Sequence, residues 1–145
     1  PTDYCAQSRT SFASIVFEDR YVFHTVSVNA EIGIVTGVSG AKRASAHACF
    51  GKTQDPDILN FYAEGELGGL LFEGRGKCTT LRRDFPEPGL NVATCFLHLG
   101  RLGDRYAGGL LTTNTLVSRN VTGDKSDPPG YVQPSIATVR LWRKR

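Results

Sequence analysis

The sequence predicts an all-β protein: a single small domain folded as a β-barrel or a sandwich of about nine strands, held together by two disulfides. Three observations support this prediction. Apolar and polar residues alternate in short runs along most of the 145 residues. Sixteen glycines and seven prolines fall between or inside these runs. The four cysteines are an even number and lack the C-x2-C spacing of a zinc site.

The N-terminal third of the chain shows the clearest alternation. Val22, Val26 and Val28 share one face of a predicted strand, with polar residues between them. His24 lies in the same register, so we expect it to be a buried core histidine. Glycines inside the next run, residues 32–38, predict a bulge, a bend or the close approach of another backbone.

Further runs follow at spacings of about ten residues, with turn residues between them. Helix is expected only as one or two turns beginning at Asp55, which is followed by Pro56. Glycines at strand bends and short local connections favour a barrel over a sandwich. The predicted strands are residues 12–17, 21–29, 32–38, 44–50, 59–64, 67–73, 77–83, 90–99, 108–117 and 135–142.

The cysteine pairing follows from a predicted hairpin. Residues 77–83 and 90–99 are joined by a turn-forming stretch, residues 84–89. If the hairpin is centred there, Cys78 and Cys95 lie directly opposite each other, where a disulfide needs only slight further approach. Cys5 is then left to pair with Cys49. Two disulfides indicate an oxidising compartment.

Other features of the chain agree with secretion. It begins with Pro1 and contains no methionine, as expected of a product whose signal peptide has been removed. Asn120 begins an Asn-Val-Thr tripeptide that fits the glycosylation pattern. No apolar run approaches the roughly 18–20 residues of a transmembrane helix. We therefore predict one secreted, extracellular β domain over residues 1–145.

Composition argues against several classes of partner. The formal net charge is only +3, and the cations are dispersed rather than arranged in the stripe expected of a nucleic-acid interface. The one dense basic cluster, at Arg140 and residues 143–145, is predicted to be a solvated chain end. The three histidines have no paired metal-ligand spacing. We predict no nucleic-acid partner, no metal and no cofactor.

The sequence favours a protein without enzymatic activity and does not exclude an enzyme. The G-x-S-x-G motif that carries a serine nucleophile is missing, and the cysteines are assigned to disulfides. The residue types of a carboxylate–histidine–arginine site, used by small secreted ribonucleases, are present without a recognisable pattern. These residues are His47, Glu64, Glu66, Glu73, Arg75 and His98.

A binding function is the leading hypothesis. Aromatic residues beside arginine resemble interface anchors, and the four candidates are Arg105, Tyr106, Arg119 and Tyr131. The candidate surfaces are residues 118–134, a long stretch without apolar periodicity, and the turn at residues 84–89. We expect an extracellular protein partner, such as a host protein or a protease. The protein would bind this partner through rigid surface loops, as effectors and protease inhibitors bind their targets. The alternatives are a β-barrel carrier of a small apolar ligand and a small secreted hydrolase acting on RNA or glycan.

Overall fold

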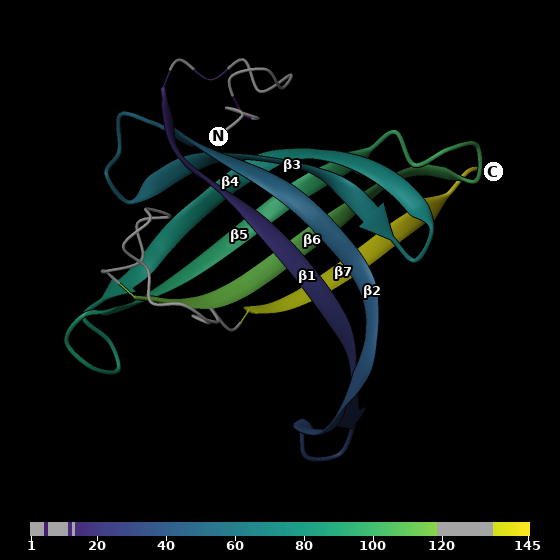
Figure 1. The fold of residues 1–145 in the computed structure, drawn as a ribbon, viewed down its shortest axis with the longest axis horizontal. Coiled ribbons are helices and arrows are strands. Elements are labelled where there is room, and N and C mark those ends of the chain that lie inside the picture. Colours follow the sequence, from purple (N-terminus) through teal and green to yellow (C-terminus); the bar gives the residue numbers. More distant parts are fainter. Residues whose placement is uncertain (1–4, 6–11, 13, 119–134) are drawn as a thin grey trace.

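The computed structural model describes residues 5, 12, 14–118 and 135–145, without the side chains of residues 15–20, 41, 42 and 118. These residues form one antiparallel sheet of seven strands, in which each strand lies beside the next one along the chain (Figure 1). Every connection that the structure describes is therefore a local hairpin. The strands are β1 (Ile15–Asn29), β2 (Ile34–Lys52), β3 (Ile58–Leu67), β4 (Leu70–Arg83), β5 (Leu90–Gly100), β6 (Tyr106–Ser118) and β7 (Ser135–Arg143).

The all-β prediction is confirmed, whereas the count of about nine strands differs from the seven observed. Three pairs of predicted short strands are single long strands, because the chain passes through β-bulges and glycines instead of turning. β1 and β2, for example, keep pairing across four register shifts. Within the described part of the chain, β1 pairs only with β2 and β7 only with β6. The sheet is thus not closed into a barrel by the pairing of those two strands.

One face of the curved sheet carries the hydrophobic core. Phe61 on β3 stacks on Phe50 of β2 with ring centroids 4.7 Å apart. Leu97 on β5 is 1% exposed. Its cross-strand partner on β6 is Leu111, which is also buried. The core continues across the inward positions of β4 and β6 and the β5–β6 loop. Its buried members are Ala48, Phe50, Phe61, Ala63, Phe72, Cys78, Leu97, Leu99, Leu102 and Leu111.

A glycine makes one part of this core possible. Gly76 on β4 lies so close to β5 that a Cβ atom there would collide with the carbonyl group of Phe96. Glycine inside a strand permits such an approach and the sharp bend that accompanies it. The bend lets successive strands curve around the inward-facing side chains.

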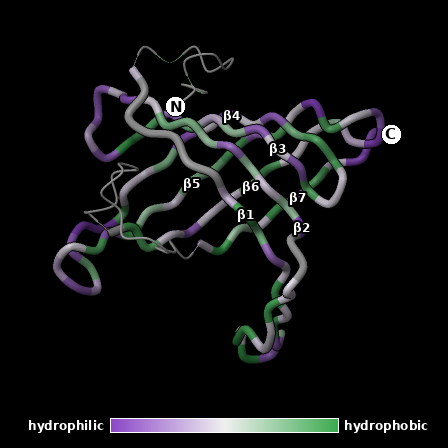
Figure 2. The backbone as a smooth tube through the Cα atoms, in the orientation of Figure 1, coloured by the Kyte–Doolittle hydropathy of each residue, from purple (hydrophilic) through white to green (hydrophobic). Residues whose placement is uncertain are grey.

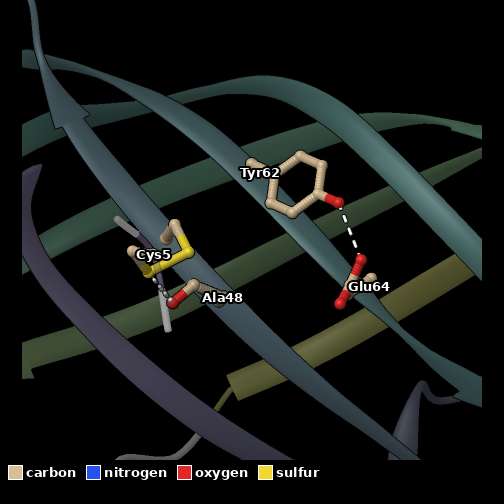
Figure 3. Close-up of a disulfide and its surroundings, with 5 residues drawn as sticks. Cys5, Ala48, Tyr62 and Glu64 are labelled. Carbon is tan, nitrogen blue, oxygen red and sulfur yellow. Dashed lines mark hydrogen bonds between the residues drawn. A yellow bond between two sulfur atoms is a disulfide. The ribbon is translucent and has the colours of Figure 1, made fainter. Parts of the chain in front are cut away.

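Both predicted disulfides are confirmed. Cys78 and Cys95 are directly opposite partners on β4 and β5, with Cα atoms 4.0 Å apart. Cys5 and Cys49 are joined with Cα atoms 5.7 Å apart, on the face of the sheet opposite to the main core. There they cover Tyr62, which is fully buried (Figure 3).

Two expectations about local structure are wrong. His24 is exposed, and its ring Nδ1 lies 2.9 Å from the carbonyl oxygen of Ser39, to which an Nδ1–H donates. The valine face of β1 faces solvent, so the residues in register with it are not in the core. Asp55 begins a turn rather than a helix, and its carboxylate accepts a hydrogen bond from the N–H of Asp57 at 2.8 Å.

Candidate functional site

The β1–β2 hairpin extends beyond the rest of the sheet. β3 pairs with β2 only from Ala44 onward. Residues 24–42, here called the arm, therefore form a two-stranded projection that reaches away from the body, at the lower end of the view in Figure 1. A two-stranded hairpin buries little apolar surface by itself, so its side chains are available to a partner.

The tip of the arm is fixed by hydrogen bonds. The side-chain oxygen of Asn29 accepts the N–H of Glu31 at 3.0 Å, and the N–H of Gly33 donates to the carbonyl oxygen of Asn29 at 2.8 Å. Gly33 has a φ of +69°, a left-handed conformation that glycine adopts without strain. The four-residue turn is therefore locally determined, and it pre-organises the end of the arm.

The arm exposes an unusual concentration of large apolar side chains. Val26 lies opposite Val38 and Val28 opposite Val35, so these four valines occupy one face. At the tip Ile32 is 64% exposed, and Figure 2 shows the hydrophobic colouring of this end. The exposed apolar residues of the arm are Val26, Val28, Ile32, Ile34, Val35 and Val38. Its sequence contains one carboxylate, Glu31, and one cation at its base, Lys42.

Register shifts occur at three places inside the arm, around His24 and between Ser27 and Val28. β-Bulges increase strand twist and bend a hairpin, and they also protect an exposed edge from pairing with other strands. The arm therefore presents its valine face more readily than its backbone edge.

The sequence-predicted binding residues are only partly described by the structure. Arg105 is exposed at the start of β6, with its guanidinium carbon 5.9 Å from the centroid of the Tyr106 ring. Tyr106 is half-buried and packs against the main core. Arg119, Tyr131 and the predicted glycosylation residue Asn120 lie outside the described residues, as does most of the segment 118–134.

The turn at residues 84–89 is exposed along nearly its whole length. Phe85 projects there, 46% exposed, with the guanidinium carbon of Arg82 5.0 Å from its ring centroid. The N–H of Gly89 donates to the Asp84 carboxylate at 3.0 Å, and Asp84 and Gly89 both have positive φ. This turn is thus an ordered surface of the kind that the sequence predicted.

The sheet also brings together the acid–base residues that had no pattern in the sequence. His47, Glu64 and Glu73 are successive cross-strand partners on β2, β3 and β4. Arg75 and His98 are partners on β4 and β5, two residues along β4 from Glu73. All five lie on the outer face, opposite the main core, because directly opposed residues of antiparallel strands share a face.

Hydrogen bonds and ion pairs order this outer-face group. The hydroxyl group of Tyr62 donates to Glu64 Oε2 at 2.8 Å (Figure 3). Glu73 accepts from Arg75 at 3.5 Å and from Arg101 at 3.2 Å. Burial, and next the hydrogen bond to Glu64, raise the pKa of the Tyr62 phenol far above its ordinary value. Tyr62 therefore acts as a neutral hydrogen-bond donor that orients the Glu64 carboxylate.

An open cleft of about 860 Å³ lies beside this group. It is lined by His47, Glu64, Glu66, Glu73 and Arg101, together with apolar residues that include Val22 and Leu71. A cleft of this volume is within the range that holds small ligands. Three carboxylates line it, so it suits a polar or cationic ligand better than an apolar one.

Comparison with known proteins gives no assignment: no family model, no curated protein and no solved structure matches this chain. In the described part of the chain, no helix has the length and apolarity needed to cross a membrane. Over the same residues, no group of three or more histidine, cysteine, aspartate or glutamate side chains is placed to hold a metal ion.

Proposed function

We propose that this protein is a secreted binding module that contacts another folded extracellular protein through the valine face and tip of the arm. The observation that carries the proposal is the group of six exposed apolar side chains on one projecting hairpin. Contiguous exposed apolar surface usually marks a site of interaction, because leaving it in water is costly. The fixed turn lowers the ordering cost of binding.

The charge of the arm favours a protein over a lipid surface. Peripheral membrane segments combine apolar residues with several lysines or arginines that attract anionic lipids. The arm has only Lys42, at its base, and Glu31 near its tip. β-Branched side chains on a nearly uncharged hairpin match the apolar centre of a protein–protein interface.

Secretion is part of the same proposal. One disulfide joins β4 to β5, and the other joins Cys5 near the N-terminus to β2. Small disulfide-bonded β domains are typical of oxidising compartments. The two disulfides are consistent with an extracellular protein, and a rigid extracellular domain is a suitable support for a preformed interaction arm.

A secreted hydrolase is a second candidate, supported by the outer-face group of Glu64, Glu73, His47, His98 and Arg75. Acid, base and a guanidinium on neighbouring strands are the components of general acid–base catalysis. Incubation with RNA and glycans tests this function. A hydrolase would lose activity in His47→Ala or His98→Ala with its thermal unfolding unchanged, and inactive wild-type protein would exclude those substrates.

The binding proposal is tested with two matched triple variants. Val26→Thr, Val28→Thr and Val35→Thr remove apolar surface from the arm while keeping β-branched side chains of similar size. The control variant, Leu81→Thr, Leu116→Thr and Ile136→Thr, changes three exposed apolar residues of the body. Proteins captured from extracellular fluid by the wild type and the control, but not by the arm variant, are purified and titrated individually.

At least one purified partner should bind the wild type and the control equally and the arm variant at least about tenfold more weakly, equivalent to about 1.4 kcal/mol. The proposal fails if no partner depends on the arm. It also fails if sedimentation shows that the arm joins two copies of this chain. Arm-dependent binding to vesicles of phosphatidylcholine and phosphatidylserine, with no arm-dependent protein, would contradict it as well.

A further inference from the structure

The outer face of β4–β7 combines exposed cations with exposed aromatic rings. Lys77 on β4 lies directly opposite Phe96 on β5, and Arg75 lies opposite His98. The same cross-strand row continues through Leu110 on β6 to Arg140 on β7. Because the core leucines occupy the alternate positions of these strands, the cations and rings face away from the core.

Cations outnumber carboxylates on this part of the sheet, where Glu73 on β4 accepts from Arg75 at 3.5 Å. β5, β6 and β7 contain no aspartate or glutamate over their described lengths. β7 ends at Arg143, which lies opposite Tyr106 on the core side, and the N–H of the next residue, Lys144, donates to the carbonyl oxygen of Arg105 at 3.2 Å. The basic tail is therefore held beside the start of β6. Lys77 on β4 and Arg140 on β7 face the same side of the sheet, with the uncharged outer-face residues of β5 and β6 between them.

Two aromatic rings lie on this face without being covered. Trp142, two residues from Arg140 and on the same side of β7, is 50% exposed. Its ring lies beside Gly108, the cross-strand partner, at van der Waals distance from the position that a Cβ atom there would take. Phe96 is 40% exposed and meets the His98 ring edge-on, with centroids 5.8 Å apart. Both rings are thus partly open to solvent on this face.

We infer that the outer face of β4–β7 binds single-stranded nucleic acid. Proteins that bind single strands use a cationic surface to follow the phosphates and aromatic side chains on which bases stack. Arg75, Lys77 and Arg140 supply the charges, and Phe96 and Trp142 supply the stacking platforms. The cations span three strand spacings, about 14 Å, which is enough for several nucleotides.

The aromatic rings favour nucleic acid over a sulfated polysaccharide. Sulfated chains have no planar bases, so their binding depends on the cations alone. A single strand should depend on both the cations and Trp142. This site is separate from the arm, and the inference departs from the expectation, drawn from the dispersed charges, that nucleic acid is not a partner.

Binding is measured on the full, disulfide-bonded chain with fluorescein-labelled dT12 and U12 by anisotropy at several salt concentrations. Trp142 is the only tryptophan in the sequence, so quenching of its emission reports directly on stacking. The variants are Lys77→Gln and Arg140→Gln for charge, and Trp142→Ala against Trp142→Phe for stacking. Lys52→Gln is the control, because Lys52 is exposed at the far end of β2.

The expected dissociation constant is micromolar at low salt, with a log–log salt slope of about −2 if three phosphates are neutralised. Lys77→Gln and Arg140→Gln should each make the slope shallower by about 0.7. Trp142→Ala should weaken binding about 5- to 150-fold, whereas Trp142→Phe retains most of it. Lys52→Gln and the arm variant should bind as the wild type does.

Three results would overturn the inference. The first is no binding of either oligonucleotide at 50 mM salt. The second is binding that Trp142→Ala leaves unchanged and that a heparin-derived dodecasaccharide reproduces, which would show a charge-only surface. The third is a loss of affinity in Lys52→Gln as large as in Lys77→Gln, which would show that no particular face is used.

Discussion

The body of the sheet and the arm are built from similar residues with opposite consequences. In the body, Phe61, Leu97 and Leu111 are buried in one cluster with the inward-facing side chains of neighbouring strands. In the arm, valines and isoleucines of the same kind are about half exposed, because no third strand covers them. Apolar alternation therefore specifies a strand in both places, but it specifies a core only where further strands add inward-facing side chains beside it.

The glycines show the same difference. A Cβ atom at Gly65, Gly76 or Gly109 of the body would meet neighbouring backbone, whereas one at Gly37 or Gly40 of the arm would meet nothing within 4 Å. Body glycines are required by packing and curvature. Arm glycines are tolerated in a projection where space is open. The comparison leads to four experiments, beginning with the largest expected effect.

Removing a large side chain should separate the two regions most strongly. Phe61→Ala should lower the free energy of unfolding by about 4 kcal/mol, because it leaves a cavity beside Phe50. Ile34→Ala in the arm should change it by less than about 0.5 kcal/mol. Urea unfolding at equilibrium measures both. A cost above about 2 kcal/mol for Ile34→Ala would show that the arm packs within the molecule and is not free for a partner.

The hairpin disulfide should matter to the body and not to the arm. Replacing Cys78 and Cys95 by alanine opens a loop with a sequence separation of 17, which is expected to cost about 3 kcal/mol on the chain-entropy model. Arm amides that exchange by local opening should keep their hydrogen-exchange rates, since neither disulfide lies in the arm. Faster local exchange at the valines of the arm would show that the arm depends on the hairpin for its order.

A single methyl group should sharpen the contrast between glycines. Gly76→Ala should cost about 2 kcal/mol or more, because β4 and β5 must separate to admit the Cβ atom. Gly37→Ala should leave stability unchanged within about 0.5 kcal/mol, since its surroundings are open. Equilibrium unfolding in guanidinium chloride measures the free energy of unfolding of both variants. Equal destabilisation would mean that the arm is as tightly constrained as the body.

Alkaline pH should affect the body through Tyr62. The folded state raises the pKa of its phenol, so it holds the proton more tightly than the unfolded chain does. This contribution to stability is complete below about pH 10 and is lost as the pH rises further, at up to about 1.4 kcal/mol per pH unit.

Unfolding measured from pH 8 to pH 11 should therefore show a weaker decline for Tyr62→Phe than for the wild type. Tyr62→Phe also loses the hydrogen bond to Glu64, so its stability at pH 8 should be lower by about 1 kcal/mol. Ile34→Ala serves as the arm control and should follow the wild-type profile. A wild-type profile that Tyr62→Phe reproduces would assign the alkaline loss to other groups.

The candidate sites were predictable only in part. The aromatic-next-to-arginine pattern selected Arg105, which is exposed, and Tyr106, which packs against the main core. The arm was missed because Val26 and Val28 have the alternation of an ordinary half-buried strand. Strand length gave no signal either, since the next predicted run, residues 44–50, is as long as the run 32–38.

By itself the sequence determined the strands and the covalent links. Alternation with period two defines a strand locally, and the turn between residues 83 and 90 places Cys78 opposite Cys95 by simple register. Tertiary structure alone decided which faces are buried and which distant residues become neighbours. His47, Glu64 and Arg75, like Lys77 and Arg140, are far apart along the chain and share a surface only because consecutive strands pair side by side. Such proximity depends on cross-strand register over the whole sheet, which no local pattern encodes.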